Sequence, residues 1–296
     1  MTGHTGFDVV VTGPPFFRGL IASGAFQLLD KHQLPNLADL NPALMAKIAG
    51  DDPDNAHGVI LAWGTYGITF DEKKVAATLP GIALNSWSVM FDPTNAAKLA
   101  QCHINALDSP AAIVPIALSY LRRDSKNPTP QDLDNVADLL RKIRPYIQNI
   151  DTAGQIEAMA NGDACVAFDS NGDAFVARRR AKEAKNGMKI NFIIPDEGSL
   201  IWFDVLAVPH DAPHVANAHK LINYFMESKV IADITNYVGF ANANSAATSL
   251  LDPSIAADPI VYPPLDRLQR LSPVPQYTPE QNRAITRLWQ KFKTGQ

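Results

Sequence analysis

The sequence predicts an α/β protein, and three observations point to this fold class. Short runs of β-branched and aromatic residues alternate with segments of helical periodicity, the pattern of strands and helices packed in layers. The 296 residues are enough for about two domains of the usual size. The 22 prolines favour many short, sharply bounded elements over a helical bundle. From the alternation we expect largely parallel sheets.

The expected elements follow one another along the whole chain. The first strand covers residues 7–12, and Gly13-Pro14-Pro15 separates it from a helix over 16–22. After a turn at 51–55, two strands over 57–63 and 66–70 flank Gly64, a candidate hinge. Later strands are expected over 164–168, 188–194 and 201–208, and helices over 71–77, 93–100, 110–122, 129–143, 152–160, 171–187, 213–226, 229–237 and 278–293.

Several of these helices carry their own boundary signals. Thr129 and Thr278 are each followed by proline, which is typical of an N-cap and a first helical position. Asn161-Gly162 is a C-cap signal that ends the helix expected over 152–160.

Charge and hydropathy exclude some classes of protein and favour others. The formal net charge of −4 argues against nucleic acid as a partner and favours a cationic ligand. Hydrophobic residues make up 46% and charged residues 19%, as in an ordinary globular protein. No apolar run approaches the length of a transmembrane helix, and the first residues lack the charged and apolar regions of a signal peptide.

The most informative stretch runs from Gly198 to Pro209 and reads as a buried strand with one carboxylate in its middle. Side chains alternate along a strand, so Trp202 and Asp204 share one face. An ionised carboxylate in an apolar strand is costly unless it meets a cation or hydrogen-bond donors, and an indole ring also attracts cations. The stretch therefore predicts a pocket for an organic amine. The alternative is an aspartate whose oxygens accept backbone N–H groups at a strand end.

Motifs of catalysis or metal binding are absent. The sequence contains no dinucleotide or P-loop glycine motif, no G-x-S-x-G and no H-E-x-x-H, and nothing supports a Ser-His-Asp triad. His210, His214 and His219 are expected to be surface residues and not a metal site. The run Arg178-Arg179-Arg180 is expected to be the solvated face of a helix. We predict no catalytic residue, no cofactor and no metal.

Cys102 and Cys165 are the only cysteines. They can form a bridge between two strand-adjacent segments or remain two buried thiols, and composition alone does not decide between these states.

Four motifs occur in an order that makes the chain recognisable. These are Asn161-Gly162-Asp163-Ala164-Cys165-Val166-Ala167, Arg180-Ala181-Lys182-Glu183-Ala184-Lys185-Asn186-Gly187, Trp202-Phe203-Asp204 and Ala241-Asn242-Ala243-Asn244-Ser245-Ala246-Ala247-Thr248. Together they closely resemble the periplasmic putrescine/polyamine-binding proteins of bacterial ABC importers. The segments Gly6-Phe7-Asp8-Val9-Val10 and Asp51-Asp52-Pro53-Asp54-Asn55 extend the match, which covers essentially the whole chain. The family begins earlier, with a signal peptide and a first strand and helix that have no counterpart in this sequence.

The resemblance implies a two-lobed periplasmic binding protein fold of type II, with the ligand in a cleft between the lobes. An amino-terminal lobe, incomplete at its start, is expected to hold residues 1–61 and 199–256. A carboxyl-terminal lobe is expected to hold residues 62–198 and 257–296. The family's cysteine pair falls on Cys102 and Cys165, so the resemblance also implies a disulfide and an oxidising compartment, the periplasm.

The resemblance also places the ligand-binding residues. The motifs match the family's amine-binding positions at Thr152, Asp173, Trp202, Asp204 and Phe240, the last of which is often tyrosine in the family. Asp204 and Asp173 would come from opposite lobes, so a diamine would bridge them.

At three places the chain departs from the family pattern. Ala112 stands where the family has a glutamate, Ser170 where it has a tryptophan, and Gly13-Pro14-Pro15 where it has a serine-rich segment. Asp169, next to Ser170, is an added acid at the carboxyl end of a strand, where α/β clefts bind ligands. We predict that it partly replaces the carboxylate missing at residue 112. The alternative is a solvated acid at a strand end.

The expected function is capture of putrescine or a related polyamine, such as spermidine, and its delivery to the membrane permease of an ABC transporter. The same fold could instead bind another cationic solute, such as an amino acid or a guanidine compound. Two further alternatives are an enzyme built on a two-lobed fold, for which no catalytic constellation is visible, and a truncated form with impaired binding.

Overall fold

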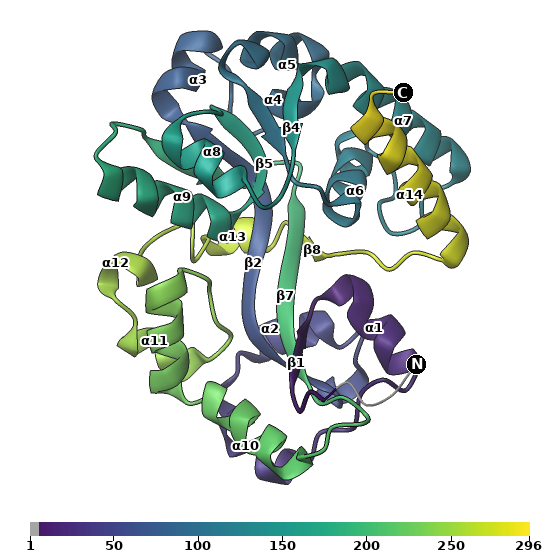
Figure 1. Cartoon of the computed structure of the whole chain (residues 1–296), viewed down its shortest axis with the longest axis vertical. Coiled ribbons are helices and arrows are strands. Elements are labelled where there is room, and N and C mark those ends of the chain that lie inside the picture. Colours follow the sequence, from purple (N-terminus) through teal and green to yellow (C-terminus); the bar gives the residue numbers. More distant parts are fainter. Residues whose placement is uncertain (1–5) are drawn as a thin grey trace. The chain divides into compact units, whose positions relative to one another are not determined.

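A computed structural model describes residues 6–296 and divides the chain into two compact units (Figure 1). Unit 1 comprises Met1–Gly64 and Trp202–Tyr262, and unit 2 comprises Thr65–Ile201 and Pro263–Gln296. Each unit is therefore built from two separate stretches of sequence, and the chain passes between the units three times. Two of these passages lie within long strands, β2 (Gly58–Asp71) and β7 (Ser199–Ala207).

In unit 1, the strand β1 (Val10–Thr12) pairs with the second half of β7 in antiparallel fashion, with Val10 opposite Ala207. The strands β7 and β2 are neighbours in the same sheet. The helices of this unit are α1 (Pro14–Ala22), α2 (Pro42–Ile48), α10 (Val215–Phe225), α11 (Ser228–Val238) and α12 (Pro253–Ala256).

The break expected at Gly64 is wrong, because β2 is one continuous strand of 14 residues. Its backbone finds partners on both sides of the glycine. Trp63 forms a bridge with Ala241, and from Tyr66 onward β2 pairs with the strand β5 (Val166–Ser170). Hydrogen bonding to successive partners keeps the chain extended, in spite of the weak strand propensity of glycine.

In unit 2 the sheet is mixed, so the expectation of largely parallel strands is wrong. The strand β3 (Ile104–Ala106) is parallel to β4 (Ile147–Ile150) and to β5. In contrast, β2 is antiparallel both to β5 and to β6 (Ile190–Ile193). The short strand β8 (Leu271–Pro273) runs parallel to the start of β7. The antiparallel pairs arise because β2 enters this unit directly from unit 1, without the helical crossover that makes neighbouring strands parallel.

The remaining helices belong to unit 2. They are α3 (Glu72–Thr78), α4 (Ser88–Phe91), α5 (Pro93–Leu99), α6 (Pro110–Tyr120), α7 (Pro130–Ile143), α8 (Gln155–Asn161), α9 (Asn171–Ala184), α13 (Leu265–Leu268) and α14 (Pro279–Thr294).

The predicted helix boundaries of α7 and α14 are confirmed. Thr129 and Thr278 cap these helices, each in a capping box with the residue three positions later. Gly162 ends α8 in the left-handed conformation, with φ of 81°. The start of α8 lies three residues later than expected, because the Asp151 carboxylate accepts the N–H groups of Ala153 and Gly154 and holds them in a turn.

The hydrophobic core of unit 2 fixes the orientation of β5. Phe168 packs on Trp87 with ring centroids 4.9 Å apart, within a cluster that includes the buried helix α6. Ala167 belongs to a different cluster, on the side of the sheet that α8 and α9 cover. Because side chains alternate along a strand, Asp169 lies on the same face as Ala167, away from the Trp87 core.

A disulfide joins Cys102 to Cys165, with the two Cα atoms 5.5 Å apart, so the expected pairing is confirmed. Cys165 directly precedes β5 and is fully buried, whereas Cys102 ends the short helical turn before β3. The bond closes a loop of 63 residues, which in the chain-entropy view stabilises the fold by restricting the unfolded chain.

We expect the denatured, unreduced protein to show no reactive thiol in a titration with a chromogenic disulfide reagent, since both cysteines are in the bond. The same sample after reduction is the control and should show two thiols. Two thiols before reduction would contradict the pairing.

The outcome for the histidines is mixed. His210 and His214 are exposed as expected. The prediction that His219 is a surface residue is wrong, since only 1% of the residue is exposed. Its Nε2 accepts the N–H of Asp30 at 2.9 Å and its Nδ1 faces the carbonyl of Val215, so α10 buries it as a hydrogen-bonded core residue. Within residues 6–296, no cluster of histidine, cysteine or acidic side chains is arranged to hold a metal ion.

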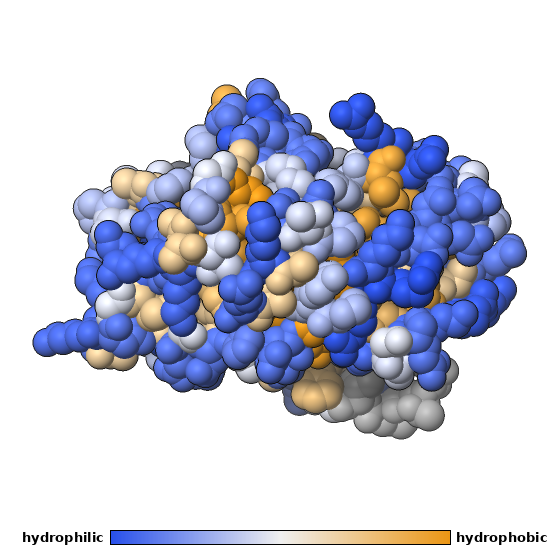
Figure 2. Space-filling view, turned by 90° about the horizontal axis from the view of Figure 1, so that it is seen from above, coloured by the Kyte–Doolittle hydropathy of each residue, from blue (hydrophilic) through white to orange (hydrophobic). Residues whose placement is uncertain are grey.

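The face of the molecule in Figure 2 is mainly hydrophilic, with small, separate hydrophobic patches. Among the described residues, none of the helices is both long and apolar enough to cross a membrane. The arginine run on α9 contributes to the polar surface: Arg180 pairs with Glu157 of α8, and Arg178 and Arg179 lie over the ring of Phe175.

Candidate functional site

In unit 1 the candidate site is centred on Trp202 and Asp204, directly after β7 enters the unit. Both are half-buried, while Ile201, Phe203 and Val205 between and beside them are buried. The alternation predicted from the sequence therefore places both side chains on one face. Burial raises the pKa of the Asp204 carboxyl above its ordinary value.

The Asp204 carboxylate has no partner in the part of the chain that the structure describes. No N–H or O–H group donates to it, and no lysine, arginine or histidine lies within ion-pair distance. The interpretation of Asp204 as an acid satisfied by backbone amides is therefore wrong. A half-buried carboxylate without donors is costly, and a cationic ligand would remove that cost.

Phe240 completes an aromatic corner beside Asp204. Its ring meets the indole of Trp202 edge to face, with centroids 5.8 Å apart and an interplanar angle of 84°. The indole Nε1 is buried and finds no acceptor among the described residues. The corner thus offers π surface and one free N–H donor.

The segment Ala241-Asn242-Ala243-Asn244 holds Phe240 in place. Asn242 donates to the Thr235 hydroxyl at 2.9 Å, and its own Oδ1 accepts the N–H of Asn244. Asn244 donates to the carbonyl of Met226 at 2.7 Å. Asn244 also caps the short helical turn 245–250 through two backbone N–H groups. The motif that made the chain recognisable is therefore a rigid support for the aromatic residue that precedes it.

In unit 2 the candidate residues lie where β5 ends and α9 begins. Ser170 is the last residue of β5 and the N-cap of α9, because its hydroxyl accepts the N–H of Asp173 at 3.2 Å. Asp173 lies in the first helical turn, where the helix dipole favours negative charge. Asp169 precedes Ser170, so two acids flank the strand-to-helix turn.

Asp169 is fully buried, so its interpretation as a solvated acid is wrong. Its carboxyl accepts a hydrogen bond from the Thr69 hydroxyl at 3.0 Å and from the N–H of Ser170 at 2.8 Å, and it also contacts the Gln155 side chain. Burial, and secondly the charge of Asp173, raise the pKa of Asp169 to about 7. Burial likewise raises the pKa of Asp173, although hydrogen bonds to Ser170 and Asp169 act in the opposite direction.

Thr152 lies in a different setting from the one expected. It is exposed and precedes α8 by three residues, and its hydroxyl accepts the N–H of Asp108 at 3.2 Å. Ala112, where the family has a glutamate, is buried on α6 with 1% exposure and contributes only a methyl group.

Three polar residues around the unit 2 acids were not predicted from the sequence. Thr69 and Gln155 contact Asp169, and Asn171 accepts the N–H of Thr65 at 2.8 Å. Thr69 stands 100 residues before the acid it contacts, so no local pattern links the two. The one available signal was the position of Asn171, directly after an N-cap serine.

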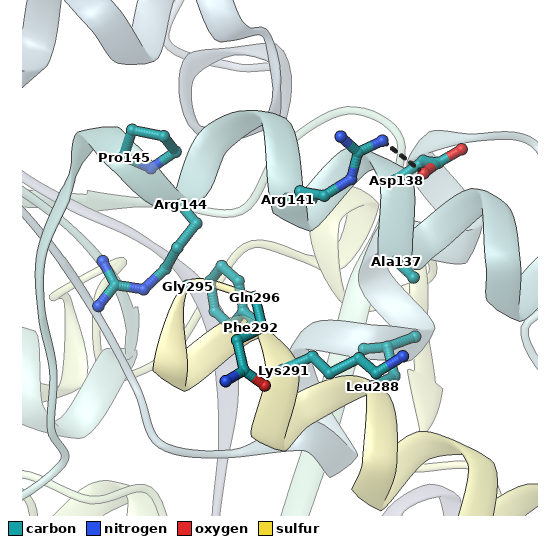
Figure 3. Close-up of a pocket in the computed structure, with 10 residues that line it drawn as sticks. All are labelled: Ala137, Asp138, Arg141, Arg144, Pro145, Leu288, Lys291, Phe292, Gly295 and Gln296. Atoms are coloured by element: carbon teal, nitrogen blue, oxygen red, sulfur yellow. Dashed lines mark hydrogen bonds and ion pairs between the residues drawn. The ribbon is translucent and has the colours of Figure 1, made fainter.

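A separate pocket of about 640 Å³ lies between α7 and α14 of unit 2 (Figure 3). Its lining includes three basic side chains, Arg141, Arg144 and Lys291, and one acid, Asp138, which pairs with Arg141 at 2.8 Å. None of the predicted site residues lines it. Its charge is unsuited to a cationic ligand.

Comparison with curated proteins gives close relatives over the full chain. The putrescine-binding periplasmic protein SpuD of Pseudomonas aeruginosa is 39% identical over 296 residues, covering 100% of this chain and 81% of the relative. The putrescine-binding periplasmic protein PotF of Escherichia coli is 39% identical over 297 residues, covering 100% and 80%. The resemblance to periplasmic polyamine-binding proteins is thus confirmed.

Comparison with solved structures agrees with these relatives. A putative spermidine/putrescine ABC transporter protein from Listeria monocytogenes superposes with a TM-score of 0.86 at 26% identity, covering 99% of this chain and 86% of that one. The predicted type II periplasmic binding protein fold is confirmed by such neighbours. The family model for bacterial extracellular solute-binding proteins matches residues 1–263. The chain therefore belongs to the bacterial extracellular solute-binding protein family.

Proposed function

We propose that this protein is the substrate-binding component of an ABC transporter, and that it captures putrescine or a related polyamine in the periplasm and delivers it to the membrane permease. The full-length identity to two putrescine-binding periplasmic proteins supports the class of ligand and the compartment. Further relatives are named as binding spermidine and putrescine, which supports a polyamine more widely.

The observation that carries the proposal is the unpartnered carboxylate of Asp204 beside the Trp202–Phe240 corner. A polyamine is a chain of methylenes with an ammonium group at each end. An ammonium would pair with the carboxylate, and the rings would cover the methylenes and add cation–π attraction of roughly 0.5–2 kcal/mol.

The acids of unit 2 fit the same ligand. Asp169 is buried and Asp173 is half-buried, and neither has a cation from the described residues, which is an environment in which an ammonium group would be stabilised. We propose that the Asp169–Asp173 group binds an ammonium group of such a ligand, and that Asp169 compensates for the carboxylate missing at Ala112.

The proposed function requires no chemical change of the ligand. The relatives are transport proteins, and the sequence offers no positioned nucleophile or cofactor motif. We therefore propose that the protein is a binder and not an enzyme.

One observation favours a second candidate, a cationic solute that also carries a hydrogen-bond acceptor. The buried Nε1 of Trp202 has no protein acceptor among the described residues, and a purely aliphatic diamine would offer none. An amino acid or a hydroxylated amine would satisfy this N–H group.

Isothermal titration calorimetry with putrescine, cadaverine, spermidine, agmatine and arginine tests both candidates. We expect a dissociation constant in the micromolar range or tighter for at least one polyamine, since charge-assisted hydrogen bonds and aromatic burial combine. Binding of arginine alone would support the second candidate, and no heat with any of the five would contradict the proposed function.

A further inference from the structure

Asp169 and Asp173 flank the same strand-to-helix turn, and their carboxyl groups are close enough for the charge of one to act on the other. An ionised carboxylate has no hydrogen to donate, so the two groups can hydrogen-bond to each other only when one of them holds a proton. Asp169 has 0% exposure and Asp173 is half-buried, so water does not screen the repulsion that two negative charges would suffer.

Neighbouring groups do not supply a cation in place of that proton. Two side chains that do not titrate contact Asp169: Thr69 from β2 and Gln155 from α8. The third neighbour is Asp173 from α9, whose negative charge acts on Asp169. Among the described residues, neither acid forms an ion pair with a lysine, arginine or histidine.

A third polar group points to a ligand at this place. The Gln155 side chain is fully buried and contacts Asp169, and its amide nitrogen donates to the carbonyl of Phe168 at 2.7 Å. Its Oε1 has no hydrogen-bond partner among the described residues. A buried carbonyl oxygen without a donor is costly. A primary ammonium group has three N–H donors and can satisfy several such acceptors at once.

We propose that Asp169 and Asp173 hold one shared proton in the ligand-free protein, and that this proton passes to solvent when an ammonium group of the ligand binds to the pair. The exchange rests on the proposed function. It conserves charge: two carboxyl groups with one proton carry one net negative charge, and two carboxylates with one ammonium carry the same. The buried pair is therefore never left with an uncompensated second charge, which would cost several kcal/mol.

The exchange predicts that polyamine binding weakens in acid. Where the free pair holds a proton that the complex lacks, the dissociation constant rises up to tenfold for each pH unit of acidification. Because the pKa of Asp169 is raised to about 7, the pH range in which the affinity depends on pH lies below neutral pH. At higher pH the ligand-free pair has already lost the proton, and the affinity should level off.

Calorimetry of putrescine binding near pH 6.5, in phosphate and in ACES buffer, measures the proton directly, because the two buffers take up protons with different heats. We expect the wild-type protein to release about one proton per putrescine and Asp169→Asn to release almost none. Asp138→Asn, which alters an exposed acid of the same unit, should behave like the wild type. Equal apparent heats in the two buffers for the wild type would overturn the exchange.

A titration of the ligand-free protein followed by ¹³C NMR of the aspartate carboxyl groups separates the proposals. We expect one carboxyl that titrates near neutral pH and is lost in Asp169→Asn, and its absence would overturn the shared proton. Binding of putrescine without proton release would refute the exchange and leave the proposed function intact. No binding of any polyamine at any pH would refute the proposed function and the exchange together.

Discussion

Replacing Asp204 with asparagine is expected to weaken polyamine binding about ten- to a hundredfold, equivalent to roughly 1.5–3 kcal/mol. Asparagine keeps the size of the side chain but loses the charge that would pair with an ammonium group. The loss should be large because the carboxylate is half-buried and has no donor or cation from the described residues to share its charge. Calorimetry with the polyamine that binds the wild type most tightly measures the change.

Asp233→Asn provides the matched control in the same unit. Asp233 lies on α11, its side chain is 61% exposed, and it pairs with Lys229 at 2.8 Å. A surface pair of this kind contributes little, so its loss should leave the affinity unchanged. The far-ultraviolet circular dichroism of both variants should match the wild type. An unchanged dissociation constant for Asp204→Asn in a folded protein would remove Asp204 from the site.

The sequence was sufficient wherever a feature depends on local chemistry. The period of two along β7 placed Trp202 and Asp204 on one face, because a strand forces this alternation whatever surrounds it. The capping residues Thr129 and Thr278 were recognisable for the same reason, since a hydroxyl at the N-cap meets N–H groups only two or three residues away. The pairing of the cysteines came from the family resemblance, because their spacing alone left the reduced state open.

Features that depend on distant partners could not be predicted. A glycine at residue 64 weakens a strand locally, but β2 stays extended because the N–H of Trp63 donates to the carbonyl of Ala241 and the strand then pairs with β5. His219 reads as a surface residue in a polar helix until the N–H of Asp30, 189 residues earlier, is seen to bond to it. Tertiary contacts overrode local propensity in both cases.

The same limit applies to the candidate site. Sequence position placed Asp169 at the carboxyl end of a strand, which is correct, but gave no sign of its burial. The burial comes from β2 and α8, whose Thr69 and Gln155 contact it from different parts of the chain. A hydroxyl and an amide that lie far away in the sequence cannot be assigned to an acid without the topology. The relation between the two acids across the strand-to-helix turn is the finding that only the structure provides.

The pH dependence of stability gives the second large effect, again at Asp169. In the unfolded chain an aspartate loses its proton near pH 4, whereas burial and the charge of Asp173 raise the pKa of Asp169 to about 7 in the folded protein. Between these values folding takes up a proton, so the stability that this group contributes is present at low pH and falls as the pH rises towards 7. Asparagine binds no proton in either state and removes this loss.

Asp169→Asn should therefore become progressively more stable than the wild type as the pH rises from about 4 to 8, by at most about 4 kcal/mol across the range. Asparagine can still accept the hydrogen bonds of Thr69 and Ser170 through its Oδ1, so the packing is retained. Urea unfolding of both proteins without ligand, at several pH values, measures the difference in stability. The titrations of all other groups cancel in that difference.

Asp138→Asn is the control of opposite sign. Hydrogen bonding to Arg141 lowers the pKa of Asp138, so its small contribution to stability is present at neutral pH and lost in acid. A stability difference between Asp169→Asn and the wild type that does not change with pH would show that Asp169 has the same pKa in the folded and the unfolded chain, and would contradict the raised pKa.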